Sequence, residues 1–455
     1  MSARLTPGAS VHFVGVGGAG MSGIARILLQ RGHAVSGSDL RDGRALAELR
    51  MLGARVEVGH AATHLGEADV VVTSTAVPVT NPEIEAARSR GIPLLRRAEM
   101  LAEVMADDRA VLIAGTHGKT TTTSMTVVAL QAAGGDPSFS IGGSLNETGA
   151  NAHAGTDGRF VAEADESDRS FLVYRPDLAV VTNIEHDHPD EFDDLDAVRG
   201  AFIDFLDRRA PGAPALVCAD DPPAREIATR VSAPVVTYGT APDADIRVLD
   251  DPGSHRLRID DQDVARFTLA VPGRHNVLNA TAALGVCHLL GVDVTAAAEG
   301  LGRFTGAARR FQRLGIVRGV EVVDDYAHHP TELRATLAAA RAVGAKRVVV
   351  VVQPHRYSRT QAFGAELGRA AAAADVVVVT DVYGSSEAAI PGVSGELVAE
   401  AAASAGAFVR YAPRLGDVVD VLLDLVEDGD LVLVTGAGDV TQVGPTLLEL
   451  LGGSR

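Results

Sequence analysis

Residues 115–120 (GTHGKT) place two glycines, a lysine and a threonine in one short turn after an apolar stretch at 110–114. Glycines let backbone amides converge on phosphate oxygens, lysine adds a point charge, and a threonine hydroxyl can ligate Mg²⁺. The turn is two residues shorter than the usual eight-position phosphate loop, so a plain glycine turn before a threonine-rich helix is the alternative. The residues expected to contact a nucleotide are Gly115, Thr116, His117, Gly118, Lys119, Thr120 and Thr121.

Two clusters of acidic and histidine residues follow expected strands further along the chain. Residues 163–168 (EADESD) follow a strand at 160–162, and residues 183–188 (NIEHDH) follow a strand at 178–182. Because ligands gather at the carboxyl ends of parallel strands, both clusters should face the phosphate turn. A carboxylate and an imidazole there are suited to holding Mg²⁺ against a nucleotide, although an acidic run alone is usually solvated surface.

A second glycine turn, at residues 15–20 (GVGGAG), fits the dinucleotide-binding pattern of glycines at positions one, three and six. Asp39 lies where an acidic residue would meet a ribose. An NAD-dependent dehydrogenase is therefore an alternative from another class, and a non-catalytic nucleotide-binding scaffold is a third. A simple dehydrogenase has no use for the independent phosphate turn at 115–120, which favours a nucleotide-consuming enzyme.

The elements that must position these residues alternate between short apolar strands and amphipathic helices. This rhythm predicts parallel sheets with helices on both faces. The expected fold is α/β in three domains: a Rossmann-like domain at 1–107, a central phosphate-loop domain at 108–309, and a Rossmann-like domain at 310–455. The expected strands lie at 11–16, 34–37, 70–73, 111–114, 160–162, 178–182, 215–218, 347–352, 375–380, 408–411 and 431–435, with further β structure at 247–270.

The composition narrows the classes of partner. The chain has 455 residues, 46% hydrophobic, and a net charge of −18. An acidic balance argues against nucleic acid or anionic membranes as partners. Cys218 and Cys287 form neither a disulfide framework nor a metal-ligand pattern, and the apolar runs are too short to span a bilayer. We expect a cytoplasmic protein. His60 and His64 lie near an expected loop, where surface placement is the simpler interpretation.

Taken together, several motifs in order along the chain resemble the Mur ligase family. They are residues 115–120, Glu163, His188, residues 273–279 (GRHNVLN) and residues 324–330 (DDYAHHP). Residues 17–23 (GGAGMSG) and 353–360 (QPHRYSRT) resemble its alanine-adding branch. The resemblance implies domains for a UDP-sugar, for ATP and for an amino acid. It implies ATP-dependent ligation of L-alanine to the lactyl carboxylate of UDP-N-acetylmuramate through an acyl phosphate, in peptidoglycan precursor synthesis. The family's recycling ligase, which adds a whole tripeptide, is the nearest alternative.

The resemblance also implies roles position by position. Lys119 contacts phosphates, Thr120, Glu163 and His188 surround magnesium, Asn276 and Asn279 lie near adenine, Arg310 reaches the phosphates and Asp325 lies near the ribose. The UDP-sugar residues would be Gly17, Gly18, Ala19, Gly20, Met21, Ser22, Ser38, Asp39, Ser74 and Thr75. The residues that bind the amino acid would be Tyr326, His328, His355, Arg356 and Arg359. We expect a monomer or a weak homodimer.

One departure from the family concerns a second magnesium. Many members hold it with a carbamylated lysine in the region after the position of His188. Here lysine occurs only at Lys119 and Lys346, so that carbamate cannot form. The absence agrees with the alanine-adding branch and leaves the second metal's ligands open.

Overall fold

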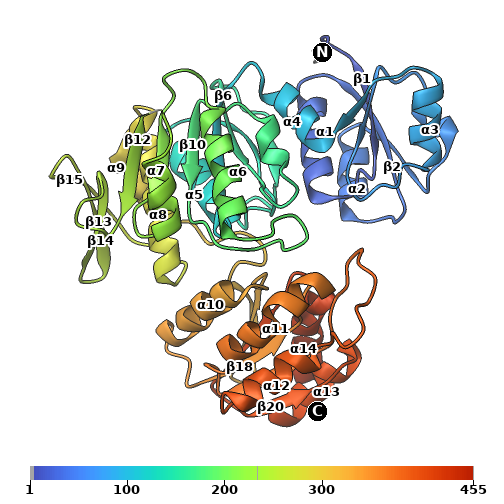
Figure 1. The fold of residues 1–455 in the computed structure, drawn as a ribbon. Helices are drawn as coiled ribbons and strands as arrows, with labels where there is room; N and C mark the ends of the chain where they lie inside the picture. Colours follow the sequence, from blue (N-terminus) through green and yellow to red (C-terminus); the bar gives the residue numbers. More distant parts are fainter. Residues whose placement is uncertain (1–4, 233, 454–455) are drawn as a thin grey trace. The chain divides into compact units, whose positions relative to one another are not determined.

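The computed structural model describes residues 5–232 and 234–453. Over these residues the chain packs as two compact units. The first comprises Met1–Glu185, Asp196–Thr268 and Asn279–Phe304, and the second comprises His186–Leu195, Leu269–Leu278 and Thr305–Arg455. The first unit contains two sheets and the second contains one, which gives three α/β domains (Figure 1).

The amino-terminal domain folds around a five-stranded parallel sheet (Figure 1). Its elements are β1 (Ser10–Val14), α1 (Ala19–Gln30), β2 (Ala34–Asp39), α2 (Arg44–Met51), β3 (Arg55–Val58), the 3-10 turn η1 (Ala62–Leu65), β4 (Val70–Thr73), α3 (Pro82–Ser89), β5 (Leu94–Arg96) and α4 (Arg97–Met105). The strand order is β3-β2-β1-β4-β5. The chain therefore leaves β1 toward one side and returns on the other, so the end of β1 is a topological switch point where such sheets bind ligands.

The central domain has a ten-stranded sheet in the order β15-β14-β13-β12-β11-β10-β6-β9-β7-β8. Its elements are β6 (Arg109–Ala114), α5 (Lys119–Ala132), β7 (Ser138–Ser140), β8 (Ala152–His153), β9 (Arg159–Glu163), η2 (Ser170–Val173), β10 (Leu178–Val181), α6 (Leu195–Asp207), β11 (Ala215–Cys218), α7 (Pro222–Ala228), β12 (Val235–Gly239), β13 (Ile246–Asp251), β14 (Ser254–Ile259), β15 (Gln262–Phe267), α8 (Arg274–Leu289) and α9 (Val294–Leu301). Strand β6 pairs in parallel with both β9 and β10. The three segments that carry the phosphate turn and the two polar clusters therefore leave the sheet at one edge.

The carboxy-terminal domain has a six-stranded sheet in the order β16-β17-β21-β18-β19-β20. Its elements are β16 (Gln312–Val317), β17 (Val320–Asp325), α10 (Pro330–Ala342), β18 (Arg347–Val352), α11 (Tyr357–Ala371), β19 (Val376–Val379), α12 (Glu396–Ser404), β20 (Val409–Tyr411), α13 (Leu415–Leu425), β21 (Asp430–Thr435), η3 (Asp439–Gln442) and α14 (Val443–Gly453). Only β16 runs antiparallel to its neighbour.

Strand β18 illustrates why the valine-rich segments form a sheet buried on both faces. Val348, Val350 and Val352 belong to one hydrophobic core, and Val349 and Val351 belong to the core on the opposite face. Successive side chains of a strand point to opposite faces, so a continuous valine run fills both layers. Helices α10, α11 and α12 contribute to the first core, and α13 and α14 to the second.

The doubly wound α/β fold expected from the sequence is confirmed. The β-rich stretch at 247–270 is an antiparallel extension made of β13, β14 and β15. The expected boundaries at 107/108 and 309/310 fall between elements, but residues 186–195 and 269–278 pack with the second unit. None of the helices in the described residues has the length and apolar character needed to cross a membrane.

Candidate functional site

The phosphate turn of the central domain links β6 to α5, and two of its positions accept only glycine. Gly115 has φ +137° and Gly118 has φ +83°, a region that side chains strongly disfavour. A Cβ on Gly115 would overlap the Thr182 hydroxyl, and one on Gly118 would lie 2.9 Å from Asn279 Oδ1. The turn thus leads directly into the amino terminus of α5, whose partial positive charge suits an anion.

Lys119, the first residue of α5, folds back over the turn. Its Nζ donates to Gly115 O at 2.7 Å and to Glu166 Oε2 at 2.8 Å. Burial lowers the pKa of the ammonium, but the charges of Glu166 and Asp165 outweigh burial and raise it. Burial raises the pKa of Glu166 to about 7 despite the ammonium beside it. Lys119 is therefore a fixed positive charge within the turn.

A hydroxyl and a carboxylate meet beside this charge. Thr120 Oγ1 donates to Glu163 Oε2 at 3.1 Å, and the backbone N–H of Gly142 donates to Glu163 Oε1 at 2.6 Å. A Cβ at Gly142 would lie 3.0 Å from the Glu163 carboxylate, so the cradle depends on glycine there. Hydroxyl and carboxylate oxygens are the donors that Mg²⁺ prefers, and this pair fits such an ion next to bound phosphates.

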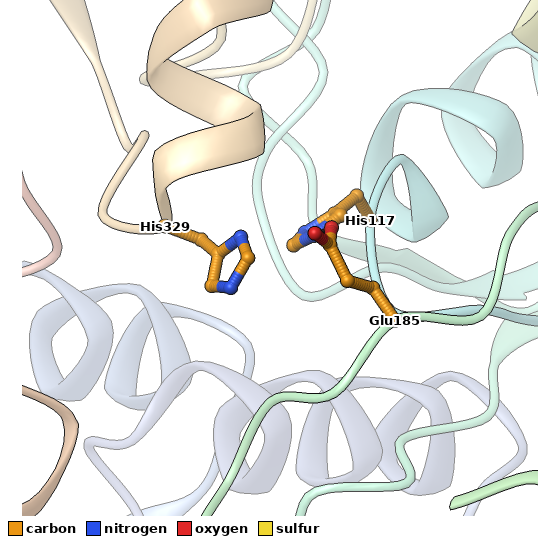
Figure 2. Close-up of side chains that lie close together, drawn as sticks. All are labelled: His117, Glu185 and His329. Carbon is orange, nitrogen blue, oxygen red and sulfur yellow. The ribbon is translucent and has the colours of Figure 1, made fainter. Parts of the chain in front are cut away.

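The segment after β10 forms hydrogen bonds to the phosphate turn. Asn183 Oδ1 accepts from His117 N at 2.8 Å, and Thr116 Oγ1 accepts from Glu185 N at 2.9 Å. His117 Nε2 lies 3.0 Å from Glu185 Oε2 (Figure 2). The two clusters that the sequence indicated do reach the phosphate turn. Sequence reasoning did not identify which members contact it, namely Glu166, Asn183 and Glu185.

The two asparagines expected near adenine fall in different units. Asn279 lies in the first unit and accepts from Thr122 Oγ1 at 3.1 Å, directly behind Gly118. Asn276 lies in the second unit, where its Nδ2 donates to Pro272 O at 2.6 Å. Thr121, on the first turn of α5, is buried.

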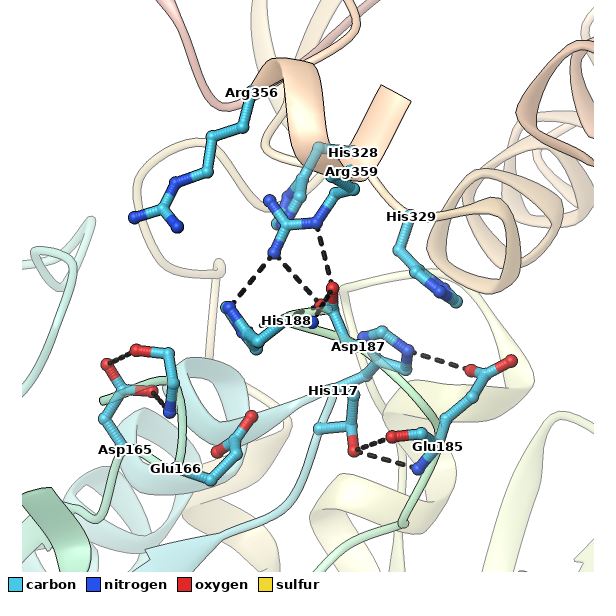
Figure 3. Close-up of polar contacts among 12 residues, drawn as sticks. His117, Asp165, Glu166, Glu185, Asp187, His188, His328, His329, Arg356 and Arg359 are labelled. Atoms are coloured by element: carbon cyan, nitrogen blue, oxygen red, sulfur yellow. Dashed lines mark hydrogen bonds and ion pairs between the residues drawn. The ribbon is translucent and has the colours of Figure 1, made fainter. Parts of the chain in front are cut away.

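In the second unit, Asp187 and Arg359 form a buried ion pair. Arg359 Nε donates to Asp187 Oδ1 at 2.9 Å, and Nη2 to Oδ2 at 3.2 Å (Figure 3). Burial raises the pKa of Asp187, but the Arg359 charge outweighs it and holds the pKa well below its usual range. Nη2 also lies 3.4 Å from Nδ1 of His188, which has φ +55°. The pair joins residues 172 apart in sequence, which fixes the segment that carries His188 on this unit.

The other residues expected to bind the amino acid surround this ion pair. His355 stacks on the Tyr383 ring with centroids 5.7 Å apart, and its ring lies 5.8 Å from that of His328. Burial lowers the pKa of His328 to about 4 and that of His355 to about 3. Both rings are therefore neutral near pH 7. Arg356 is half-buried and donates to Asp190 at 2.8 Å.

Tyr326, Arg310 and Asp325 form a neighbouring group. The Arg310 guanidinium lies 5.1 Å from the Tyr326 ring centroid, within cation–π range, and 3.8 Å from Glu332. Asp325 is buried and accepts from Phe311 N at 2.7 Å and Ala327 N at 2.8 Å. Burial raises the pKa of Asp325 to about 6. The Asp325 carboxylate thus holds the backbone immediately after Arg310 and immediately after Tyr326.

The glycine turn of the amino-terminal domain opens into a cavity of about 590 Å³. Of the residues expected to bind the UDP-sugar, the following line it: Gly18, Ala19, Gly20, Met21, Asp39 and Ser74. Gly17 N donates to Asp39 Oδ2 at 2.9 Å, so one amide of the turn is already bonded to a carboxylate of the protein. Ser22 bonds within its own helix, Thr75 lines an adjacent pocket, and Ser38 is fully buried behind the cavity.

The adjacent pocket, of about 330 Å³, contains arginines that the sequence did not single out. It is lined by Arg96, Arg97, Asp168 and Arg169, among others. Arg97 lines both pockets, and a Cβ at Gly20 would lie 3.1 Å from its Cδ. A guanidinium next to the amino terminus of α1 is well placed for a diphosphate. Two adjacent arginines after a strand of an acidic chain were the available sequence signal.

Comparisons with known proteins identify the family. Models described as "Mur ligase family, catalytic domain", "Mur ligase middle domain" and "Mur ligase, glutamate ligase domain" match residues 10–109, 113–287 and 309–438. The UDP-N-acetylmuramate–L-alanine ligase of Acidothermus cellulolyticus is 51% identical, covering 97% of this chain and 94% of that protein. The enzyme of the same name from Kineococcus radiotolerans is 51% identical, covering 97% and 96%.

Solved structures agree with these relatives. A UDP-N-acetylmuramate–alanine ligase from Thermotoga maritima has a TM-score of 0.82 at 29% identity, covering 98% of this chain and 100% of that chain. A murein peptide ligase from Psychrobacter arcticus has a TM-score of 0.75 at 26% identity, covering 98% and 100%.

Proposed function

The chain belongs to the Mur ligase family, and we propose that it joins L-alanine to the lactyl carboxylate of UDP-N-acetylmuramate with consumption of ATP. The observation that carries this proposal is the phosphate turn in which Lys119, Thr120 and Glu163 converge. The relatives that share about half of its residues over nearly the whole chain carry that activity in their names. The reaction would take place in the cytoplasm, as a step of peptidoglycan precursor synthesis.

The chemistry needs two successive transfers. The lactyl carboxylate attacks the γ-phosphorus of ATP, which forms an acyl phosphate and releases ADP. The amine of alanine then attacks the acyl carbon, and collapse of the tetrahedral intermediate expels phosphate and forms the amide. Both steps depend on positioning and on neutralising negative charge, because the protein forms no covalent intermediate of its own.

Residues of the phosphate turn would supply that neutralisation. Lys119, held at Gly115 O and Glu166, places its ammonium where the β- and γ-phosphates would lie. Thr120 and Glu163 would hold Mg²⁺, which would supply positive charge to offset that of the phosphates. We assign Glu185 and Asn183 to holding the shape of the turn through His117 and Thr116. We retain His188 and Arg310 as predicted contacts of the nucleotide.

The UDP-sugar would occupy the cavity of the amino-terminal domain. The amino terminus of α1 and the Arg97 guanidinium suit its diphosphate, and the apolar wall near Leu40, Val77 and Pro78 suits a base. An NAD-dependent reaction is not favoured. Asp39 points back to Gly17 N rather than being free for a ribose, and a second, lysine-bearing phosphate turn is present.

The amino-acid pocket is assigned to the second unit. The rings of Tyr326, His328 and His355 pack in sequence, with neighbouring centroids 5.4 Å and 5.8 Å apart, and we assign them to contacts with the small side chain of alanine. The carboxylate of alanine would pair with Arg356, whose partner Asp190 is exposed, rather than with both arginines. Two Arg359 nitrogens already bond Asp187, so we assign Arg359 to orienting the segment that carries His188.

A turnover assay tests the proposal. Phosphate release should require ATP, UDP-N-acetylmuramate and L-alanine together, and mass spectrometry should find a product heavier than the acceptor by one alanyl residue. A panel of amino acids and the L-alanyl-γ-D-glutamyl-diaminopimelate tripeptide provides the comparison. Turnover with the tripeptide but not with L-alanine would move the protein to the recycling branch. NAD reduction without phosphate release would overturn the proposal entirely.

A further inference from the structure

A buried network behind the cavity of the amino-terminal domain centres on Glu83, in the first turn of α3. The Glu83 side chain is fully buried, as are those of His12 and Ser38. Glu83 Oε2 accepts from Ser38 Oγ at 2.6 Å and lies 3.3 Å from His12 Nε2. Oε1 accepts from Ala61 N at 3.1 Å and lies 3.1 Å from His64 Nδ1. His60 and His64 are mostly buried, so their expected surface placement is wrong.

Four donors around one carboxylate indicate that Glu83 is ionised. A buried carboxylate without partners is strongly unfavourable, and here each oxygen has two. Burial raises the pKa of Glu83, but the bonds from His12 and Ser38 outweigh it and lower the pKa to about 2. Every group that touches the carboxylate must then act as a donor.

This requirement fixes the direction of the next hydrogen bond. A serine hydroxyl has one proton, and Ser38 gives it to Glu83. Ser38 Oγ lies 2.8 Å from His60 Nδ1, so the serine must be the acceptor and His60 the donor in that contact. Neutral His60 therefore has its proton on Nδ1 and a free electron pair on Nε2.

His60 is the member of the network that reaches the cavity. It lines the cavity together with Asp39, Leu40 and Val77, and its side chain is 14% exposed. Among the described residues, none hydrogen-bonds to Nε2 of His60, and none of the four donors to Glu83 lines the cavity. His60 is thus the member of the network that a ligand in the cavity can contact, and its Nε2 is a hydrogen-bond acceptor.

We propose that Glu83, acting through Ser38, sets His60 as an acceptor whose Nε2 receives an N–H or O–H of the nucleoside part of the nucleotide-sugar. The inference rests on the proposed function only in taking this cavity as the UDP-sugar site. Uracil offers one such donor, its ring N3–H, and the ribose offers its 2′- and 3′-hydroxyls. His60 is then a specificity-determining residue, and Glu83 and Ser38 are positioning residues that do not touch the ligand.

Calorimetric titration of the full-length protein tests this assignment. The ligands are UDP-N-acetylmuramate and its N3-methyluridine, 2′-deoxy and 3′-deoxy analogues. The wild type should bind one analogue roughly three- to tenfold more weakly than the parent, since one hydrogen bond is lost. The analogue that is affected identifies the donor. Equal affinity for all four ligands would overturn the inference, while failure to bind the parent would instead overturn the UDP-sugar assignment.

Matched variants test the chain of hydrogen bonds from Glu83 through Ser38 to His60. His60→Asn keeps a donor for Ser38 but removes the Nε2 acceptor, and Ser38→Ala frees the ring to change tautomer. Each should weaken parent binding roughly three- to tenfold and bring the sensitive analogue to within twofold of the parent. The double variant should be no weaker than His60→Asn alone. The control is His64→Asn, which has the same chemistry at a ring that bonds Glu83 but does not line the cavity. It should keep the wild-type discrimination.

A measurement without substitution covers the case in which buried variants lose their fold. Selective ¹⁵N labelling of histidine should give a protonated Nδ1 and an unprotonated Nε2 for His60 at pH 7.5, assigned by loss of its signals in His60→Asn. A proton on Nε2 in the wild type would overturn the proposal. So would undiminished analogue discrimination in folded Ser38→Ala.

Discussion

The two glycine-rich turns of the first unit look alike in sequence but differ in the side chains around them. Both follow a central parallel strand and lead into a helix, α1 after Gly18 and α5 after Gly118. In the first, Gly17 N is bonded to the Asp39 carboxylate. In the second, Lys119 bonds Gly115 O, and Thr120 and Glu163 meet beside it.

The difference teaches that glycines determine where an anion can approach, while the flanking side chains determine which anion it is. A helix amino terminus with the Arg97 guanidinium beside it is suited to a diphosphate. A helix amino terminus with an ammonium, a hydroxyl and a carboxylate is suited to a metal-bound triphosphate that must react. Substitutions at the first turn and at the second turn should therefore affect the binding of different substrates.

The largest effect is expected at Lys119. Lys119→Ala should reduce ligation by at least about 1,000-fold, because residues 115–120 contain no second lysine or arginine. Glu166 can take up a proton once the ammonium is gone, since burial already raises its pKa to about 7, so the fold should persist. Steady-state turnover with circular dichroism as the fold control measures this.

Lys119→Arg is the sharper version of the same test. The ammonium fits between Gly115 O and Glu166, at 2.7 Å and 2.8 Å, and a planar guanidinium is too wide for that space. We expect this variant to be as inactive as Lys119→Ala. Near-normal turnover would mean that charge alone matters, and the contrast between the two turns would lose its geometric basis.

The next effect concerns the metal. Glu163→Ala and His188→Ala should each reduce catalysis by about 2–4 kcal/mol of transition-state stabilisation, comparable to other lost electrostatic groups. Raising Mg²⁺ should recover part of the loss, and the KM for UDP-N-acetylmuramate should change little. Titration of turnover against Mg²⁺ measures both. Unchanged magnesium dependence in either variant would remove that residue from the metal site.

A smaller effect is expected at the first turn. Arg97 lies against Gly20, and Arg97→Ala should raise the KM for UDP-N-acetylmuramate about tenfold, the loss of one charge-assisted contact to the diphosphate. The KM for ATP should not change. Arg90→Ala provides the control, because Arg90 bonds Gly66 O away from both pockets. An equal rise in both KM values would indicate that the turns do not act separately.

The parts of this molecule that follow from local pattern were predictable from sequence. Buried parallel strands read as continuous valine runs, as in β18 and β19, and a glycine turn before a helix marks a phosphate site. The packing of residues 186–195 with the second unit was not predictable, because it depends on the ion pair between Asp187 and Arg359, which are 172 residues apart. Within the cluster at 163–168 the pattern could not tell Asp165, which caps Ser167, from Glu166, which reaches Lys119.

The smallest effect separates two arginines of the second unit, where no glycine turn is involved. Arg356 is half-buried and its partner Asp190 is exposed, so Arg356→Ala should raise the KM for L-alanine several-fold and leave stability within about 0.5 kcal/mol. Arg359→Ala leaves Asp187 buried without its partner, which should cost roughly 3–5 kcal/mol of stability.

Thermal unfolding and the three KM values distinguish the two roles. If Arg356 alone binds the carboxylate, Arg356→Ala loses affinity for L-alanine and keeps its melting temperature. It also discriminates less strongly against D-alanine than the wild type does. If Arg359 binds the carboxylate directly, Arg359→Lys should restore stability but not the KM for L-alanine, since a lysine keeps the charge but cannot reproduce a bidentate contact. Equal rises in the KM for all three substrates in Arg356→Ala would instead indicate impaired closure of the site. The carboxylate would then have to be assigned to another group, because Arg356 would be acting on the protein and not on the amino acid.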